Sequence, residues 1–552
     1  MSAYNRYNRR DFLATSSVAL AGAAVLGFRS RPLGAQALRS RLPVATLLPD
    51  IVDPATLRQL ALGAMDAAKS AGASFADIRI ANRRMFQMTY WIPTQPPQSS
   101  IGFDYSYGIR VRVDGGWAFG YGADPTPEGV AETVRGAVAT ARGLAKVSGG
   151  SDEFAAAPVV TGEWATPIKI DPFSISPDEH AYMLGAYMSA AMRIPDGGTG
   201  PAGFYWLAET RVFASSEGSI ITQHLAQARP RVILAKSPPV GMGGRLEVTE
   251  LAPAGAGYEI ALGTTLQDKI KEATEEAARL ASYPEANVDV GRYEAVLDGT
   301  SVGAALGATL LPALELDRVL GQTANAGGTS FLAPPEKILG LPMFSAALTV
   351  TADRALPHLG AAKWDDEGVE TEAFPVVHQG AIVDYFATRS TAPALASWYA
   401  KNGKSSDKLH GSAVSWLPTR APIGSASHLT VSSGASGVTL DALTKQLVNG
   451  VLVRGVTYAH SDQQLTSGAF YPYMLYEVKK GQITRRLRHG AVQFSTKKFW
   501  KSVTAFGDAS SVQSYIRNGA NGQPWVPTIQ PIMAPAAHFQ ELNVTAREDR
   551  AI

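Results

Sequence analysis

The chain has 552 residues, of which 45% are apolar and 18% are charged. This composition excludes an intrinsically disordered chain, and the length predicts more than one domain. The formal net charge of +2 gives no general attraction for nucleic acid. Since the chain has no cysteine, disulfides, zinc–thiolate sites, iron–sulfur clusters and a thiol nucleophile are excluded as well.

The first residues have the pattern of a twin-arginine export signal. Arg9 and Arg10 precede an apolar, alanine-rich run from Phe12 to Phe28, and Ala35-Gln36-Ala37 follows as a cleavage site. A membrane anchor is the alternative, but the run is short for a bilayer core of ~30 Å. We therefore predict that residues 1–37 are an export signal. The remaining protein is expected to be soluble in the periplasm or another extracytoplasmic space, without membrane attachment after signal removal.

The pattern of residues 38–290 predicts an N-terminal α+β domain with an antiparallel sheet. Helices are expected to start at Asp53-Pro54, at Thr126-Pro127 and at the capping box beginning with Ser176. A fourth helix is expected over 266–282. Alternating segments predict strands at Phe75–Ile80, Gly108–Val113, Trp117–Phe119, Thr210–Ala214 and Ser219–Gln223, with a turn at Gly115-Gly116.

Residues 291–552 predict a second domain of α+β class that is rich in short strands. Two helices are expected, over Val302–Leu314 and Asp441–Val448, and Pro312 should end or kink the first of them. The expected strands are Tyr293–Leu297, Ala373–Val377, Ala381–Thr388, Val451–Tyr458, Met474–Val478 and Ala491–Phe494.

Several short motifs, in this order and spacing, resemble the TldD/PmbA (TldE) metallopeptidase family. The most specific is Asp365-Asp366-Glu367-Gly368, which precedes a strand-like segment from Gly380 to Tyr385. The other matching segments are Ala71–Arg79, Gly108–Val111, Gly116–Phe119, Ser216–Gly218, Tyr293–Asp298, Leu314–Val319 and Ser467–Phe470. The resemblance implies a two-domain subunit within a hollow dimer that admits unfolded or short peptides.

The family's zinc motif is missing from this chain. In active members a His-Glu-x-x-x-His helix precedes the segment matched here by Leu314–Val319, and a later cysteine is the third ligand. The resemblance would place the histidines at 307 and 312 and the glutamate at 308. This chain has Gly307, Ala308 and Pro312 there, none of which has a side chain that binds metal or moves a proton. We therefore predict no metal ligand, no cofactor-binding residue and no catalytic residue from this motif.

Other groups could still support chemistry. His460, Asp462 and His410 lie in the same predicted domain and could form an unrecognised hydrolase site if the fold brings them together. Asp365, Asp366 and Glu367 could form a calcium or magnesium loop, although the twelve-residue EF-hand pattern is absent. No nucleophile elbow or nucleotide-binding glycine motif accompanies these groups.

The sequence therefore predicts a metallopeptidase homologue that is inactive on its own. Its expected partner is a zinc-bearing TldD-like paralogue in a heterodimer, or a second copy in a homodimer, and any zinc would be held by the partner subunit. Its expected ligands are unfolded or short peptides, and nucleic acid is not expected. Two alternatives stay open: a peptide hydrolase that uses an unrecognised site, and an exported peptide-binding protein that acts alone.

Overall fold

The computed structural model describes residues 52–546, except 91–95, 124, 149–153, 192–198, 235–247, 251–254, most of 263–281, 355–357, 404–408, 427 and 522–525. The predicted export signal and most of the helix expected over 266–282 lie outside the described residues. Within the described part of the chain, no helix is long and apolar enough to span a membrane.

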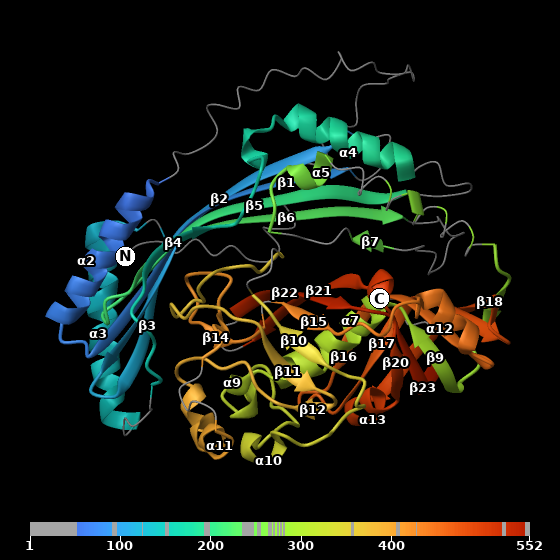
Figure 1. The fold of residues 1–552 in the computed structure, drawn as a ribbon. Coiled ribbons are helices and arrows are strands. Elements are labelled where there is room, and N and C mark those ends of the chain that lie inside the picture. The colour runs from blue at the N-terminus through green and yellow to red at the C-terminus, as the bar shows by residue number, and fades with distance from the viewer. Residues whose placement is uncertain are drawn as a thin grey trace. The chain divides into compact units, whose positions relative to one another are not determined.

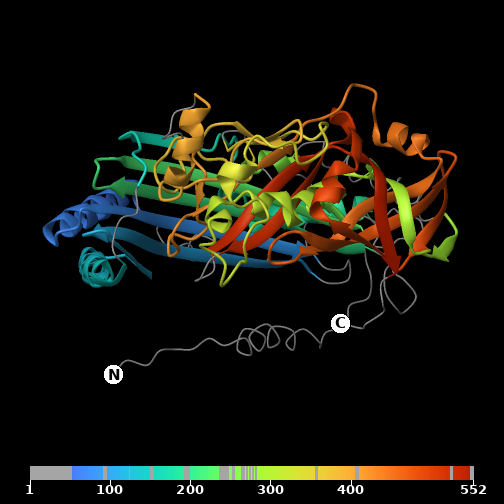
Figure 2. The ribbon, with the colours of Figure 1, turned by 90° about the horizontal axis from the view of Figure 1, so that it is seen from below.

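A seven-stranded sheet forms the N-terminal part of the described chain, in the order β3-β2-β1-β5-β6-β4, with β7 paired to β6. Figures 1 and 2 show that β1, β2, β5 and β6 are long and curved. The predicted antiparallel pairing is confirmed for β1, which pairs with β2 and β5. The strands are β1 (Phe75–Tyr90), β2 (Gln98–Val113), β3 (Gly116–Ala123), β4 (Thr161–Ala165), β5 (Thr199–Ser215), β6 (Ile220–Leu234) and β7 (Val248–Glu250).

The turn between β2 and β3 lies one residue earlier than predicted. Asp114 and Gly115 both have positive φ, at 50° and 84°, and Gly116 already belongs to β3. Two consecutive residues with positive φ match the right-handed twist of a hairpin, and Asp-Gly is a favoured pair for such a turn. The strands themselves, β2 (Gln98–Val113) and β3 (Gly116–Ala123), are longer than the sequence predicted.

Helices cover both ends of this sheet. α2 (Pro54–Ser70) and α3 (Pro127–Ser148) share a core with the first half of β1, as the positions of Leu57 and Val134 show. Leu144, near the end of α3, is 45% exposed. α4 (Pro177–Ala191) packs on the second half of β1, close to α5 (Glu259–Leu262). Its predicted cap is confirmed, because the amide of Glu179 donates to Ser176 Oγ at 3.2 Å.

A six-stranded sheet, an eight-stranded sheet and a short strand pair form the C-terminal part. The six-stranded sheet has the order β12-β11-β10-β15-β22-β21. Its strands are β10 (Val350–Ala352), β11 (Phe374–His378), β12 (Ala381–Ile382), β15 (Leu429–Val431), β21 (Gln513–Asn521) and β22 (Val526–Ala534). The strand predicted over Ala381–Thr388 is thus mostly wrong, because regular pairing stops after Ile382 and only an isolated bridge joins Phe386 to Glu315.

In the eight-stranded sheet, five strands close into a ring, β16-β9-β23-β19-β17, because β17 also pairs with β16. The sheet comprises β8 (Glu285–Asn287), β9 (Gly291–Leu297), β16 (Asn449–Ser461), β17 (Ser467–Lys479), β18 (Gln482–Arg488), β19 (Gly490–Ser495), β20 (Val503–Phe506) and β23 (Ala537–Ala546). A separate pair is formed by β13 (Ala413–Val414) and β14 (Ile423–Gly424).

The central helix of this part is α7 (Gly299–Ala308), which contacts β16 on one side and β21 and β22 on another. Gly299 and Ser301 to Gly307 are buried, as expected for a helix without a polar face. The remaining elements are α8 (Leu310–Ala313), α9 (Leu316–Val319), α10 (Pro335–Ile338), α11 (Ala396–Lys401), α12 (Leu440–Gln446), α13 (Thr496–Lys501), η2 (Pro172–Ser174), η3 (Ala392–Leu395) and η4 (Ala509–Ser511).

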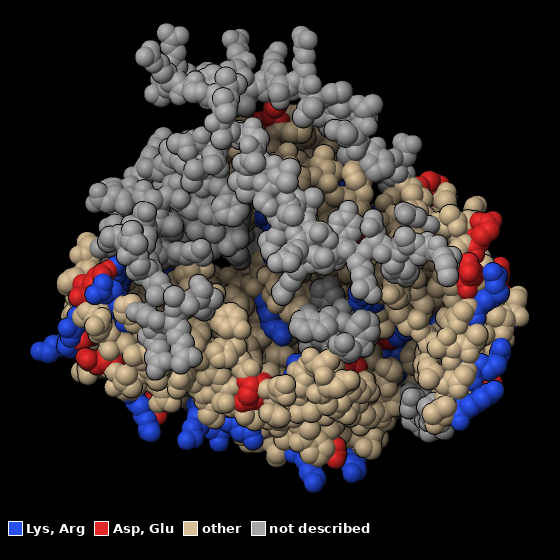
Figure 3. Space-filling view, turned by 180° about the vertical axis from the view of Figure 1, so that it is seen from behind, with Lys and Arg blue, Asp and Glu red and all other residues tan. Residues whose placement is uncertain are grey.

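Figure 3 shows the distribution of charged side chains on one face. On the face seen in Figure 3, basic and acidic residues are interspersed among uncharged ones, and basic atoms are also visible in the hollow near its centre.

Candidate functional site

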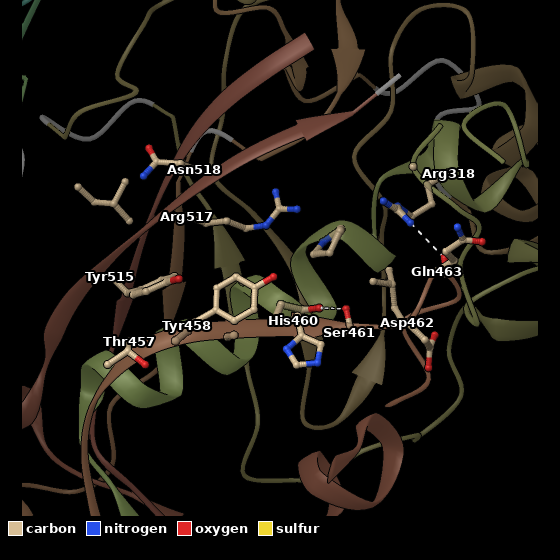
Figure 4. A pocket seen from close by; sticks show the side chains of 18 residues that line it. Arg318, Thr457, Tyr458, His460, Ser461, Asp462, Gln463, Tyr515, Arg517 and Asn518 are labelled. Carbon is tan, nitrogen blue, oxygen red and sulfur yellow. Dashed lines mark hydrogen bonds between the residues drawn. The ribbon is translucent and has the colours of Figure 1, made fainter. Parts of the chain in front are cut away.

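A pocket of about 480 Å³ lies beside the C-terminal end of α7. Its walls come from α7, α8, α9, β16 and β21 (Figure 4). Gly307, Ala308 and Pro312 all line it. The three positions at which the resemblance would place the zinc motif therefore surround one cavity.

Pro312 interrupts the helix beside this pocket, as predicted. α7 ends at Ala308, Thr309 has the non-helical angles φ −123° and ψ −79°, and α8 begins at Leu310. Pro312 has no N–H to donate to the carbonyl of Ala308. Ser461 Oγ on β16 donates to that carbonyl instead, at 2.6 Å. The hydroxyl thus satisfies the backbone oxygen that the proline leaves unpaired.

Gly307 is in close contact with the side chain of Arg517. A Cβ atom at position 307 would lie 3.3 Å from Cδ of Arg517 and 3.2 Å from Cδ1 of Ile532. One turn earlier, a Cβ at Gly303 would lie 2.8 Å from Cβ of Tyr515. Side chains of β21 and β22 therefore cover the face of α7 on which the first metal-binding histidine would be expected.

Two buried or partly buried arginines give this pocket its positive charge. Arg318 Nη1 donates to the carbonyls of Thr329 and Gln463, at 3.4 and 3.3 Å, and its Nε lies 3.9 Å from Glu315 Oε2. Arg517 donates to Oε1 of Gln530. Burial lowers the pKa of both guanidinium groups from its ordinary value, although both stay charged at neutral pH.

Aromatic rings form another wall of the pocket. Tyr458 is 61% exposed, and its ring stacks on those of His460 and Tyr471, with centroids 5.5 and 6.4 Å apart. Tyr458 and His460 are two residues apart on β16, so their side chains lie on the same face of the strand. Sequence patterns alone do not indicate that Tyr458 and His460 are exposed while Tyr476 and Phe494 are buried.

Comparison with known proteins identifies the family. Residues 290–546 match the model of the PmbA/TldA metallopeptidase C-terminal domain, and residues 77–141 match that of PmbA/TldA metallopeptidase domain 1. The chain belongs to the TldD/PmbA metallopeptidase family. A metalloprotease from Methanothermobacter thermautotrophicus is 23% identical over 408 residues, which are 72% of this chain and 81% of that protein.

Solved structures of similar fold come from several organisms. TldE from Thermococcus kodakarensis has a TM-score of 0.65 at 14% identity, over 88% of this chain and 100% of that one. A protein from Thermotoga maritima described as a proposed modulator of DNA gyrase has a TM-score of 0.65 at 15% identity, over 89% and 100%. The predicted α+β, two-domain TldD/PmbA fold is confirmed, whereas the boundary near residue 290 stays a prediction.

The pocket residues of this family member do not fit a zinc ion. Gly307, Ala308 and Pro312 have no ligating side-chain atom, and the lining residues with such atoms are His460 and Asp462. Asp462 accepts five hydrogen bonds within its own turn, from the amides of Gln464, Thr466 and Ser467 and the hydroxyls of Thr466 and Ser467. In the described part of the chain, no group of three His, Cys, Asp or Glu is arranged to hold a metal.

The fold does not assemble His460, Asp462 and His410 into one site. His410 lies in a different cavity, where it hydrogen-bonds Glu372 at 2.5 Å and Asp384 at 3.1 Å and stacks on Phe374. Asp462 is engaged in its turn, as described above, and its hydrogen bonds lower its pKa to about 2 against the opposing effect of burial. The triad proposed for the hydrolase alternative is therefore not formed.

The acidic loop Asp365-Asp366-Glu367-Gly368 is buried rather than solvated. Glu367 accepts from Arg110 Nη1 at 2.5 Å, and Asp366 accepts from Arg211. Asp365 accepts from the amides of Glu367, Val369 and Ala413, at 2.8 to 3.0 Å. These carboxylates, considered from sequence as a calcium or magnesium loop, are hydrogen-bonded to arginines and backbone amides.

The arginines on this loop come from strands of the N-terminal sheet and form a buried ion network. Arg110 also pairs with Asp77, and Arg211 also pairs with Glu209. Burial alone would lower the pKa of Arg110, but Asp77 and Glu367 raise it above its ordinary value. Burial would likewise raise the pKa of Asp366, but its neighbouring arginines, Arg211 first, lower it. This network fixes the loop onto β1, β2 and β5.

Asp317 gives the protein a pH-dependent stability that can be measured. Burial, and then the nearby Glu315 and Glu367, raise its pKa to about 7. The folded state therefore favours the protonated carboxyl. The stability that the protonated Asp317 contributes is fully present below about pH 4 and is lost as pH rises through 7. When pH rises from about 5 to about 8, the free energy of unfolding should therefore fall by about 2 kcal/mol less for Asp317→Asn than for the unmodified chain.

Urea unfolding at the two pH values measures this difference. Asp441→Asn, at an exposed position of α12, is the matched control and should behave like the unmodified chain. Equal pH slopes for the Asp317 variant and the unmodified chain would contradict the assignment.

Proposed function

We propose that this chain is an exported, zinc-free member of the TldD/PmbA family that completes a peptide-degrading dimer with a zinc-bearing paralogue. The observation that carries the proposal is the pocket beside α7. The positions of the metal ligands and of the general base have no suitable side chain, and Arg517 packs on Gly307. Such a subunit cannot activate a metal-bound water by itself.

Family membership supports a role with peptides. The family is one of metallopeptidases, and the similar protein from Methanothermobacter thermautotrophicus is named a metalloprotease. The resemblance to the branch that lacks the zinc motif supports pairing with a zinc-bearing subunit, with a homodimer as the other arrangement. The formal net charge of +2 also gives no general attraction for nucleic acid.

A peptidase assay with three arms tests the proposal. The chain alone should be inactive, a mixture with a zinc-motif paralogue should cleave unfolded peptides, and a chelator should abolish that activity. Metal analysis of the chain alone should find much less than one zinc per chain. One bound zinc together with chelator-sensitive activity of the chain alone would refute the proposal.

The same assay separates the two alternatives. Chelator-resistant cleavage by the chain alone would support the hydrolase alternative, although the fold does not assemble its expected residues. Peptide binding without any activity in the mixture would support a binding protein that acts alone.

Export rests on the arginine pair at the N-terminus. Replacing Arg9 and Arg10 together by lysine should retain the protein in the cytoplasm, as cell fractionation would show. Arg29→Lys, in the same segment but outside the pair, is the control and should still be exported. Unchanged export of the double variant would contradict the twin-arginine route.

A further inference from the structure

The pocket beside α7 contains two guanidinium groups that extend toward one space. Figure 4 shows Arg517 reaching in from β21 and Arg318 from α9 on the opposite side. Asp462 is the one acidic residue among the lining residues. Its oxygens accept hydrogen bonds from the amides and hydroxyls of its own turn. The pocket is therefore a positively charged cavity.

Arg517 retains donors for a ligand. A guanidinium has five N–H donors, and among the described residues Arg517 donates from one nitrogen, Nη1, to Oε1 of Gln530. Among the described residues, no carboxylate forms an ion pair with this guanidinium; burial lowers its pKa, and the charge of Glu315, which lies 3.9 Å from Arg318 Nε, opposes that effect. The contact of its Cβ and Cδ with Gly307 holds the side chain against α7. A positioned guanidinium without a carboxylate partner binds anions well, and its planar fork matches a carboxylate.

The other walls indicate what carries the anion. Tyr458 and Tyr515 present aromatic surface, and Asn518 presents an amide, next to the two arginines. Aromatic and amide groups contact peptide side chains and backbone well, whereas they add little to the binding of a free inorganic anion. A site of this volume holds a few residues of peptide.

We infer that this pocket binds a carboxylate group of a peptide, with Arg517 as its direct partner and Arg318 adding positive charge. The inference rests on the proposed peptide-related function and names the ligand group for the pocket. The carboxylate can be the C-terminus of the peptide or an acidic side chain, since both present the same two oxygens. In this chain, the pocket at the positions of the family's zinc motif thus recognises a peptide carboxylate.

A binding assay with one labelled peptide in three forms tests this inference. A five-residue alanine peptide with an uncharged fluorescent label is titrated with the full chain as the C-terminal acid, as the C-terminal amide, and as an amide ending in glutamate. Fluorescence anisotropy should show that the acid binds about tenfold more tightly than the amide. The glutamate-containing amide distinguishes the two sources: tight binding assigns an acidic side chain as well, and weak binding assigns the C-terminus alone.

Variants at Arg517 test whether this residue causes the preference for the acid over the amide. Arg517→Met should abolish the preference for the acid and leave binding of the amide unchanged, while Arg517→Lys should keep part of the preference because it keeps the charge without the fork. Arg485→Met is the control, since Arg485 pairs with Glu477 on the neighbouring strand and is not among the pocket's lining residues. Thermal unfolding confirms that each variant is folded.

Two results would overturn the inference, and they differ from failure of the proposed function. Equal affinity for acid and amide would refute carboxylate recognition while leaving a peptide-binding subunit intact. Equal weakening of both forms by Arg517→Met would show that Arg517 only supports the fold. Absence of any peptide binding would contradict both the inference and the peptide role.

Discussion

Gly307→His is expected to lower the free energy of unfolding by about 3 kcal/mol. The new Cβ would lie within 3.3 Å of both Ile532 Cδ1 and Arg517 Cδ, and the imidazole must extend further into the same space. Overpacking of a buried site typically costs about 1–3 kcal/mol, and here a helix and a strand would have to separate. Restoring the first histidine of the zinc motif should therefore damage the fold before it restores metal binding.

Urea unfolding with a double-mutant cycle measures this clash. Arg517→Ala in the Gly307→His background should recover about 1 kcal/mol or more, because it removes the Cδ atom that the histidine meets. Gly143→His is the matched control: Gly143 is an exposed glycine of α3, and a Cβ there would have no neighbour within 4 Å. If the two histidine variants lost equal stability, the close packing of Gly307 would be wrong.

Helix caps and prolines in the sequence predicted correctly the elements whose ends depend on interactions within one turn. The helix starting at Asp53-Pro54 was confirmed with Pro54 in its first turn, although Asp53 makes no side-chain cap hydrogen bond. The cap at Ser176 was confirmed because capping acts within one turn. The break at Pro312 was confirmed for the same reason. The ring closure between β16 and β17 and the truncation of the strand after Ile382 depend on long-range pairing, which local periodicity does not record.

The candidate site was only half predictable. The loss of the zinc motif could be seen at Gly307, Ala308 and Pro312, because side-chain chemistry alone excludes them as ligands. The position of Arg517 at this site could not be predicted from the sequence. Arg517 lies about two hundred residues after Gly307 along the chain and reaches it only through the packing of β21 on α7. The proposed cluster of His460 and His410 failed because sequence spacing carries no information about which cavity a residue faces.

The motifs that carry the family resemblance meet in the ion network. Asp77, Arg110 and Glu367 come from three different matching segments, and the structure places their side chains in direct contact. A fourth segment contributes Glu217, whose carboxylate binds both Nη atoms of Arg389, at 2.7 and 2.8 Å. These matches therefore reflect how the loop is held on the sheet, which is separate from the zinc motif that is missing at Gly307, Ala308 and Pro312.

Arg110→Met is expected to be the most destabilising single substitution in that network, with a loss of about 3–5 kcal/mol. Arg110 donates to Asp77 and Glu367, whose side chains are only 3% and 1% exposed. Methionine keeps the volume but leaves both carboxylates without this cation in a place where water cannot replace it. Lys445→Met is the control, because its pair with Asp441 is exposed and should be worth less than about 1 kcal/mol.

The triple variant Arg110→Met, Asp77→Asn, Glu367→Gln separates the effect of unpaired charge from that of lost packing. If uncompensated carboxylates cause the loss, neutralising both should recover more than half of the stability in urea unfolding, even though two more native side chains are changed. If packing of the arginine stem is responsible, the triple variant should be no more stable than Arg110→Met. A loss for Arg110→Met as small as that for Lys445→Met would contradict the central place of Arg110 in holding the acidic loop.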